Sequence, residues 1–219
     1  MRLLVVTAVA AERDAVAAGL RGAGHTGVHT DVIAAGIGPA AAAAGTATAL
    51  TRSPAPYDLV VSAGIGGGFQ PAAPVGSVAV AETIVAADLG AQTPDGFLPV
   101  AELGFGVSEH RPPAALSAAV ARALGAVHGP VLTVSTVTGS AARAAELAGR
   151  HPGAVAEAME GFGVAEAAAS HGVPVLEIRT VSNAVGPRDR AAWRIGDALA
   201  ALTVAFGKLP AVLAVEELI

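Results

Sequence analysis

Short apolar runs rich in β-branched residues alternate along the chain with alanine-rich stretches. Runs of the first kind, bounded by glycine, proline or polar residues, are typical of buried strands. Six of them predict strands: "LLVVTA", "VIAAGIG", "YDLVVSAGIGGGF", "GSVAVAETIVA", "GPVLTVSTVTGS" and "VPVLEIRTVSN". "VIAAGIG" is expected to end in a glycine turn and "YDLVVSAGIGGGF" to break into a glycine loop.

The alanine-rich stretches predict helices over residues 11–21, over 39–52 with Pro39 in the first turn, and from 190 to about 206. In "AVAEAMEGFGVAEAAASHG" we expect a short strand and then a helix closed by Gly172. This alternation indicates an α/β fold, a three-layer α/β/α sandwich around a central, mostly parallel (mixed) sheet. No break in composition marks a boundary, so we expect a single domain over 1–219.

The segment from Leu89 to Pro113 is rich in glycine and proline, and we interpret it as a long excursion or lid. At the N-terminus, "MRLLVVTAVAAE" has the positive start and apolar run of a signal peptide. The alternative is a first buried strand. We favour the strand, because the run is short and the helix-forming "AERDAVAAGL" follows at once.

Composition narrows the class of protein. The chain has 53% hydrophobic and 14% charged residues, but no apolar run reaches the ~20 residues of a spanning helix, so no membrane is expected. A net charge of -5 and the lack of a basic run argue against nucleic acid as a partner. Cysteine is absent, which excludes thiolate chemistry and fits a cytoplasmic enzyme.

Several polar or glycine-rich turns follow the predicted strands. Ligands of parallel sheets bind beyond the carboxyl ends of the strands, so we expect these turns to converge: residues 36–38, 64–68 (with Ile65 and Gly66), Thr136-Val137, 158–160 and Ser182-Asn183. Glycine turns let backbone N–H groups approach an anion or a sugar closely. Neither glycine loop matches a dinucleotide or phosphate-loop motif, so no cofactor is expected. The alternative is that these segments are tight turns that bind no ligand.

Three charged residues stand out. Glu160 lies among apolar residues with no cation four positions away, which favours a ligand-facing role; Glu157 is the weaker candidate. Arg179 interrupts a strand otherwise fit for burial, and pairing with Glu12 or Glu160 is expected. Taken alone, Glu12 is explained as a glutamate in the first turn of a helix, where its charge interacts favourably with the helix dipole. The histidines, with one i,i+4 pair at His25 and His29, form no metal-ligand cluster.

Five segments in order, "TAVAAERDAV", "AGIGPAAAA", "LVVSAGIGGGF", "AMEG" and "EIRTVSNAVG", resemble the nucleoside phosphorylase/hydrolase superfamily, and specifically its nucleosidase branch. The resemblance covers nearly the whole chain and implies a nucleoside phosphorylase-like fold. Within the branch, "VSNAVGPRDRAAWRIGDAL" is similar to the futalosine hydrolases of an alternative menaquinone pathway. Those enzymes release hypoxanthine from futalosine, an inosine with a carboxyphenyl-oxopropyl extension at its 5′ end.

The resemblance implies roles for single residues. Glu12 would orient or deprotonate the attacking water, which Arg179 would help to hold. Glu160 would accept hydrogen bonds from the ribose hydroxyls, with Met159 beneath the sugar. Ser182 and Asn183 would lie at the base, and the backbone near Val137 would contact the purine edge. Ile65 replaces a serine of some relatives near the water, and Thr136 replaces a phenylalanine that often stacks on adenine.

Asn183 bears on the choice of base, because relatives that act on 6-aminopurines carry an aspartate there. A 6-oxopurine offers acceptors at O6 and N7, which an amide NH₂ matches. Arg188, Arg190 and Arg194 are candidates for gripping the carboxylate of a 5′ extension, with ion pairs or a subunit contact as the alternative. Asp189 is expected to cap the following helix, and Trp193 to pack against it.

Other functions remain open at this point. A methylthioadenosine or S-adenosylhomocysteine nucleosidase is the nearest alternative, and Asn183 argues against it. A phosphorylase is disfavoured, because no arginine adjoins the glycine loops to bind phosphate. A nucleoside-binding protein on the same scaffold would not need a water-activating carboxylate. The superfamily commonly forms homo-oligomers, so a homodimer or larger assembly is expected.

Overall fold

A computed structural model describes residues 1–24 and 26–215 of the chain. In chain order its first elements are β1 (Arg2–Thr7), α1 (Ala10–Gly22), β2 (His29–Ala34), α2 (Pro39–Arg52), β3 (Leu59–Gly68), β4 (Val78–Ala86), β5 (Gly90–Thr93), β6 (Gly96–Pro99) and β7 (Glu109–His110). They are followed by α3 (Ala114–Leu124), β8 (Val127–Thr133), α4 (Ala141–Arg150), β9 (Ala156–Ala158), α5 (Gly161–Ser170), β10 (Val175–Ala184), the 3₁₀ turn η1 (Arg190–Ala192) and α6 (Ile195–Leu213).

The main sheet is mixed and mostly parallel, as predicted. Its strand order is β10-β4-β8-β9-β3-β1-β2, and β10 also pairs with β3, so part of the sheet closes on itself. The pairs β1–β2, β1–β3, β3–β10, β4–β8 and β8–β9 are parallel, whereas β4–β10 and β3–β9 are antiparallel. The closure was not foreseen from the sequence, and it places β9 and β10 on opposite edges of β3.

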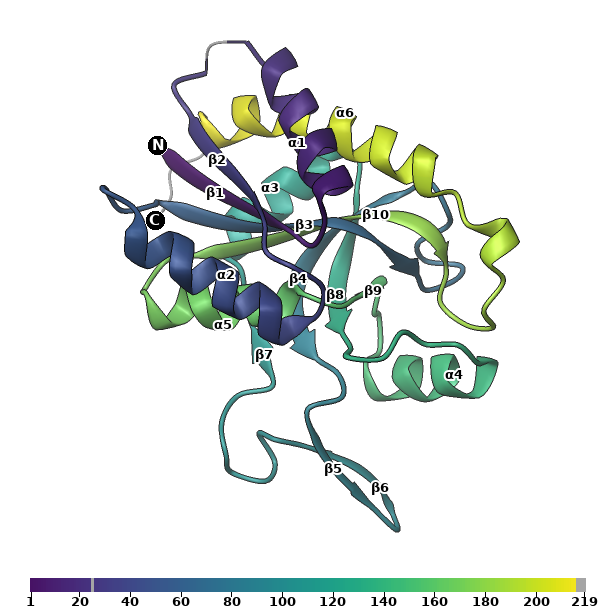
Figure 1. Ribbon diagram of the computed structural model, residues 1–219. Helices are drawn as coiled ribbons and strands as arrows, with labels where there is room; N and C mark the ends of the chain where they lie inside the picture. Colours follow the sequence, from purple (N-terminus) through teal and green to yellow (C-terminus); the bar gives the residue numbers. More distant parts are fainter. Residues whose placement is uncertain (25, 216–219) are drawn as a thin grey trace.

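Helices cover both faces of the sheet (Figure 1). Helices α1, α3 and α6 lie on one face and α2 and α5 on the other. Side chains alternate between the faces, as strand geometry requires. In β1, Leu3 and Val5 join the core under α1, α3 and α6, whereas Leu4 and Val6 join the core under α2 and α5. The predicted α/β/α arrangement is confirmed.

Glycines let two pairs of helices approach closely. A Cβ atom at Gly163 of α5 would lie 2.0 Å from the carbonyl oxygen of Pro39 in α2. A Cβ at Gly19 of α1 would lie 2.2 Å from the carbonyl oxygen of Thr203 in α6. No side chain fits at such distances, so these glycines fix how closely the paired helices pack.

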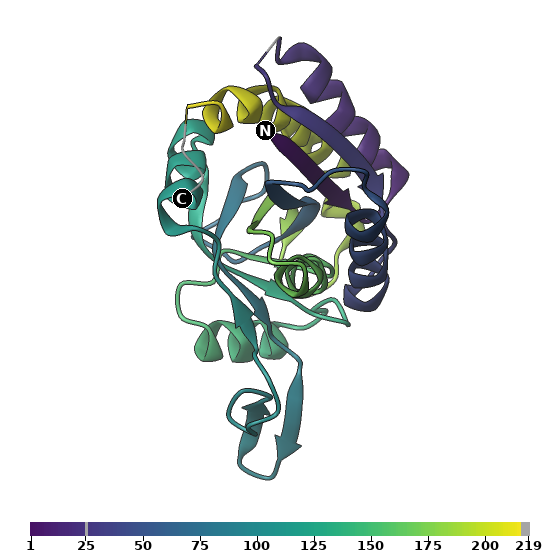
Figure 2. The same cartoon turned by 90° about the vertical axis from the view of Figure 1, so that its left-hand side faces the viewer.

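Four local expectations need correction or completion. Strand β3 continues through its glycines to Gly68 instead of breaking into a loop at 64–68, because β10 and β9 pair with that part. The helix expected from 190 is a 3₁₀ turn over 190–192 followed by α6 from Ile195. The segment 89–113 contains the hairpin β5–β6, which projects from the body (Figure 2). Helices α3 and α4 were not predicted.

Helix α6 is the one described helix whose length and composition would allow it to cross a membrane, with a mean hydropathy of 1.4. One face of α6 packs inside the fold, whereas Ile195 and Val204 are exposed. Leu202, Phe206 and Leu209 are fully buried, in the core shared with α1 and α3. The charged residues Asp197 and Lys208 also interrupt the apolar sequence of this helix. We therefore describe α6 as a core layer of the α/β fold.

Candidate active site

A cavity of about 300 Å³ lies where β1, β3 and β10 end. We call it the site cavity. It gathers side chains from segments far apart in the sequence, and its lining is mainly apolar with three carboxylates and one amide: Ala8, Val9, Glu12, Ile37, Ile65, Gly66, Gly67, Val137, Glu157, Ala158, Met159, Glu160, Ser182, Asn183 and Trp193. The turns expected to converge after the strands therefore do meet, although Thr136 is not among the lining residues.

Glu12 is held by backbone N–H groups at the start of α1. Its Oε2 accepts hydrogen bonds from Ala8 N at 3.0 Å and Val9 N at 3.3 Å, and its Oε1 accepts one from Ile65 N at 2.9 Å. An ionised carboxylate has about four acceptor positions, so roughly one remains for a group in the cavity. The three backbone donors fix the carboxylate in one orientation.

Arg179 lies behind the cavity instead of lining it. The side chain is 1% exposed and is held on three sides: Nε donates to Glu177 Oε1 at 2.8 Å, Nη1 to Glu160 Oε2 at 3.3 Å, and Nη2 to Ser62 Oγ at 3.0 Å. Burial alone would lower the pKa of the guanidinium. The surrounding carboxylates, Glu177 foremost, outweigh burial and raise it.

Gly64 lies where Glu12 and Arg179 approach each other. A Cβ atom at Gly64 would be 2.6 Å from Glu12 Oε1 and 2.8 Å from Arg179 Nη1. The glycine therefore leaves room for a carboxylate and a guanidinium over the same strand position. Arg179 pairs with Glu160, one of the two expected partners, and approaches Glu12 without a recorded hydrogen bond.

Glu177 is the partner of Arg179 that sequence reasoning missed. It is fully buried in β10, and burial raises the pKa of its carboxyl, an effect that the neighbouring Arg179 opposes. Among the described residues its Oε2 has no hydrogen-bond partner. The i,i+2 spacing of Glu177 and Arg179 in a strand, which puts both side chains on one face, was the available signal.

Glu160 stands at the first position before α5 and is held between two elements. Its Oε1 accepts from the backbone N–H of Gly38 at 3.2 Å, at the start of α2, while Oε2 accepts from Arg179. Glu160 and Glu12 thus face one cavity, with a single guanidinium behind them. The surplus of carboxylates makes this side of the cavity suitable for a group that carries positive charge.

The base-recognition candidates Ser182 and Asn183 lie at a β-bulge. The register between β10 and β3 shifts between Val181 and Asn183, so that Asn183 pairs with Gly67. Bulges commonly redirect side chains beside active sites. Ser182 Oγ donates to Asn183 Oδ1 at 2.8 Å, and Asn183 Nδ2 donates to the carbonyl of Ala184 at 2.9 Å. One N–H of the amide remains for a ligand.

Glu157, the weaker candidate, is 4% exposed and lines the cavity beside Ala158 and Met159. Thr138 donates its backbone N–H to Oε1 at 2.9 Å and its hydroxyl to Oε2. Burial raises the pKa of the Glu157 carboxyl, and the hydrogen bonds from Thr138 oppose that rise. Sequence reasoning undervalued Glu157, because nothing local shows that β9 directs it toward the cavity.

The arginines after β10 lie outside the cavity lining. Arg188 and Arg190 lie over the ring of Trp193, with guanidinium carbons 5.6 and 5.9 Å from its centroid, whereas Arg194 pairs with Asp197. Asp189 caps η1, accepting from Ala191 N at 3.1 Å. Trp193 itself lines the cavity, so the expectation that it only packs against the helix is incomplete.

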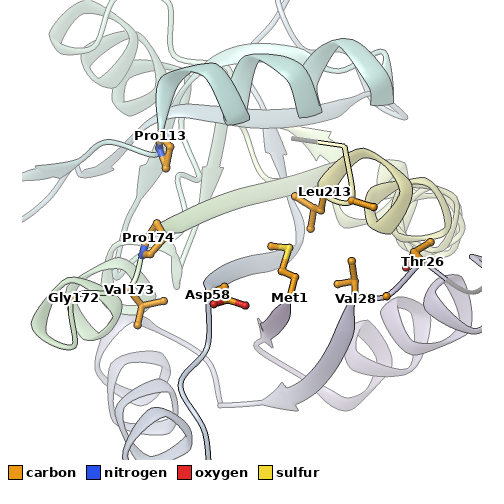
Figure 3. A pocket seen from close by; sticks show the side chains of 11 residues that line it. Met1, Thr26, Val28, Asp58, Pro113, Gly172, Val173, Pro174 and Leu213 are labelled. Carbon is orange, nitrogen blue, oxygen red and sulfur yellow. The ribbon is translucent and has the colours of Figure 1, made fainter. Parts of the chain in front are cut away.

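Two other features of the described residues bear on chemistry. A larger cavity of about 860 Å³ lies at the amino ends of the strands, and Asp58 is the one charged side chain in its lining (Figure 3). The Asp58 carboxylate already accepts a hydrogen bond from Arg2 N at 2.7 Å. No group of three or more potential metal ligands occurs in the part of the chain that is described. His29 is described there, whereas His25 lies outside the described residues.

Comparison with known proteins gives a consistent result. Residues 9–214 match the family model of the phosphorylase superfamily. A futalosine hydrolase of Streptomyces coelicolor is 66% identical, covering 97% of both chains, and one of Acidothermus cellulolyticus is 49% identical, covering 96% of this chain and 91% of that protein. A solved methylthioadenosine/S-adenosylhomocysteine nucleosidase of Colwellia psychrerythraea, in complex with adenine, has the same fold, with a TM-score of 0.78, 23% identity, and coverage of 98% of this chain and 94% of that one.

Proposed function

The chain belongs to the phosphorylase superfamily, and we propose that within it the protein is a purine nucleosidase that hydrolyses futalosine. It breaks the bond between C1′ of the ribose and the purine, which releases hypoxanthine and dehypoxanthinyl futalosine. The observation that carries this function is the meeting of Glu12, Glu160 and Asn183 in one cavity. The similarity to futalosine hydrolases names the substrate and with it an alternative menaquinone pathway. The absence of cysteine supports a cytoplasmic location.

The cleavage of an N-glycosidic bond builds positive charge on the sugar and negative charge on the departing base. Carboxylates near the sugar stabilise the first charge, and hydrogen-bond donors at the base stabilise the second. Glu12 and Glu160 supply the carboxylates. The free amide N–H of Asn183 supplies a donor on the other side. Glu12, Glu160 and Asn183 therefore supply the two kinds of group that the reaction requires.

Glu12 acts as the general base in this proposal. Water attacks C1′ as the bond to the purine breaks, and the carboxylate of Glu12 takes a proton from that water. Its three backbone hydrogen bonds leave about one acceptor position for the water. Arg179 does not line the cavity, so it acts as a positioning residue that holds Glu160 and lies beside Glu12. Glu160 accepts hydrogen bonds from the ribose hydroxyls, above Met159.

Asn183 binds the 6-oxopurine base in this proposal. Its N–H donates to O6 or N7 of the 6-oxopurine, and Ser182 holds the amide from the other side. The departing base is stabilised by hydrogen bonds, and its proton arrives from water. Val137 and the backbone around Ile65 and Gly66 supply the remaining contacts with the substrate, whereas Thr136 has no role in this proposal.

Arg188 and Arg190 bind the carboxylate of the 5′ extension. Trp193 lines the cavity, and the guanidinium groups of both arginines lie over its ring. A phenyl group packed on the indole would direct its carboxylate toward the guanidinium groups. Replacing Arg188 or Arg190 with alanine is expected to raise KM for futalosine and to spare inosine. Equal losses on both substrates would contradict a carboxylate clamp.

We also propose that the protein works as a homodimer or a larger homo-oligomer. Three apolar side chains at the cavity are unusually exposed for their size: Ile37 is 63% exposed, Val9 39% and Val137 38%. A second copy packed over them would cover apolar surface and exclude water from the reaction. Light scattering coupled to gel filtration tests this proposal, and a monomer at micromolar concentration would contradict it.

The reaction type is tested with purified protein and futalosine, with phosphate varied from zero to millimolar. We expect hypoxanthine at a rate independent of phosphate, and a sugar product whose mass carries no phosphate. A rate that requires phosphate, with a sugar phosphate as product, would favour a phosphorylase. Tight binding of futalosine without release of base would favour a nucleoside-binding protein.

A further inference from the structure

Glu157 is a buried carboxylate in the site cavity for which the proposed reaction has no task. Its recorded hydrogen-bond partner is Thr138, whose N–H and hydroxyl both donate to it. A buried carboxylate that faces a cavity is costly unless donors satisfy it. Thr138 fills two of about four acceptor positions. The remaining two are open to a donor from a ligand in the cavity.

Strand pairing places Glu157 opposite Asn183. Gly67 of β3 pairs with Glu157 of β9 on one edge and with Asn183 of β10 on the other. Directly paired residues project from the same face of a sheet, and all three residues line the cavity. With a strand spacing of about 4.8 Å, the Cα atoms of Glu157 and Asn183 are roughly 10 Å apart.

Gly67 keeps the space between the two polar side chains open. A Cβ atom there would lie 3.0 Å from Val185 Cγ2 and 3.3 Å from Asn183 Nδ2, so the amide lies over this glycine. The result is a flat floor with an amide on one side and a carboxylate on the other. A planar heterocycle fits such a space when its edge carries an acceptor toward the amide and a donor toward the carboxylate.

We propose that Glu157 is a second specificity-determining residue for the base, whose carboxylate accepts the N1–H of a 6-oxopurine while Asn183 donates to its O6 or N7. The inference rests on the proposed function and deepens it. In its lactam form a 6-oxopurine carries hydrogen on N1, next to O6. A 6-aminopurine carries a lone pair on N1, which an ionised carboxylate repels.

Asn183 alone would discriminate weakly between the two bases. Its amide can turn so that oxygen faces an exocyclic amine, and the Ser182 hydroxyl can accept as well as donate in response. Glu157 has less freedom, because Thr138 donates to both of its oxygens. Those two hydrogen bonds favour the acceptor-only carboxylate and oppose burial, which raises the pKa of the carboxyl. Selection against adenine therefore depends on Glu157 more than on Asn183.

The test compares Glu157→Ala and Glu157→Gln with the wild type and with Glu102→Gln, an exposed glutamate outside the cavity lining. We would measure kcat/KM for futalosine and its 6-amino analogue, and Kd for hypoxanthine, 1-methylhypoxanthine and adenine by calorimetry. Loss of a charge-assisted hydrogen bond changes affinity by about 10- to 100-fold. We expect Glu157→Ala to lower the ratio of futalosine to 6-amino activity by that factor, and Glu102→Gln to leave it unchanged.

The free bases separate a specific role from a structural one. Wild-type protein is expected to bind hypoxanthine more tightly than 1-methylhypoxanthine, and Glu157→Ala to bind both alike. Glu157→Gln, whose amide can donate to N1, is expected to gain activity on the 6-amino analogue. Equal losses on both substrates, or an unchanged ratio, would overturn the proposal.

Two further results keep the inference testable on its own. If the Glu157 variants do not fold, equal affinity of the wild type for hypoxanthine and 1-methylhypoxanthine would overturn it. If the wild type releases no hypoxanthine from futalosine, the proposed function itself fails. If the wild type releases hypoxanthine and Glu157→Ala keeps the same selectivity for futalosine over its 6-amino analogue, only the role of Glu157 is refuted.

Discussion

Replacing Arg179 with methionine is the strongest test of how the site is held together. The side chain is 1% exposed and forms ion pairs with Glu177 at 2.8 Å and Glu160 at 3.3 Å. Methionine keeps most of the volume but leaves these carboxylates without their cation. Removing one partner of a buried ion pair typically costs about 3–5 kcal/mol. For a chain of this size that loss corresponds to a fall in Tm of about 6–20 °C.

The second variant in this test is Arg179→Met with Glu177→Gln. Arg179→Met leaves the buried Glu177 carboxylate without its cation, and Glu177→Gln removes that charge. We therefore expect the double variant to recover about 2 kcal/mol or more of the lost stability. Urea unfolding of the wild type, both single variants and the double variant measures the coupling. An Arg179→Met protein within about 1 kcal/mol of the wild type would refute the reasoning, because such a small loss does not fit a buried cation that neutralises two carboxylates.

We also expect the stability loss of Arg179→Met to depend on pH. Burial raises the pKa of Glu177, and Arg179 opposes the rise, so removing Arg179 raises that pKa further. The folded variant then binds a proton at pH values where the unfolded chain does not. Unfolding free energy rises as pH falls wherever the folded state binds more protons. The penalty of Arg179→Met should therefore shrink as pH falls through the folded pKa of Glu177 toward its unfolded value.

Three substitutions test single parts of the site. Glu12→Gln should lower kcat on futalosine by about 10²- to 10⁴-fold, because the general base is lost. With the fold intact, the Kd for hypoxanthine should stay within twofold of the wild type. A kcat near that of the wild type would contradict the role of Glu12 as general base. Gly64→Ala should displace Glu12 or Arg179, since its Cβ would lie 2.6 Å from Glu12 Oε1 and 2.8 Å from Arg179 Nη1. Steady-state kinetics should show a loss in kcat. Unchanged kinetics would contradict the close approach of these two side chains. Asn183→Asp should reduce kcat/KM on inosine-type substrates about tenfold or more, because a carboxylate faces the acceptors O6 and N7, and an unchanged value would refute the role of the amide.

The sequence was sufficient for the elements whose patterns are local. Helix α2 begins at Pro39 and ends at Arg52, as predicted, because a proline in the first turn and an apolar, alanine-rich run mark it clearly. Strand β10 was likewise visible in its β-branched run. Helices α3 and α4 were missed, since proline and glycine around them obscured the helical pattern, and strand β3 was wrongly broken at its glycines. Those glycines stay in the sheet because β9 and β10 pair with them, which depends on distant segments.

The candidate site divides in the same way. Glu160 stood out because it lies among apolar residues with no cation four positions away. Asn183 stood out because it follows a predicted strand, and the carboxyl ends of strands meet at one edge. Glu12 gained its role only from the family resemblance. Glu157 and Trp193 could not be placed in the cavity from the sequence, because the short strand β9 and the turn at η1 orient them through tertiary contacts. The partnership of Arg179 with Glu177 was local enough to be predicted from strand geometry.

The central claim is that this site cleaves a 6-oxopurine nucleoside with an acidic 5′ extension. It is tested most directly by giving purified protein futalosine, inosine and methylthioadenosine in phosphate-free buffer and measuring the released bases by chromatography. We predict hypoxanthine from futalosine far faster than from inosine, and no adenine. Adenine from methylthioadenosine at a comparable rate, or no base from any of the three, would contradict the account.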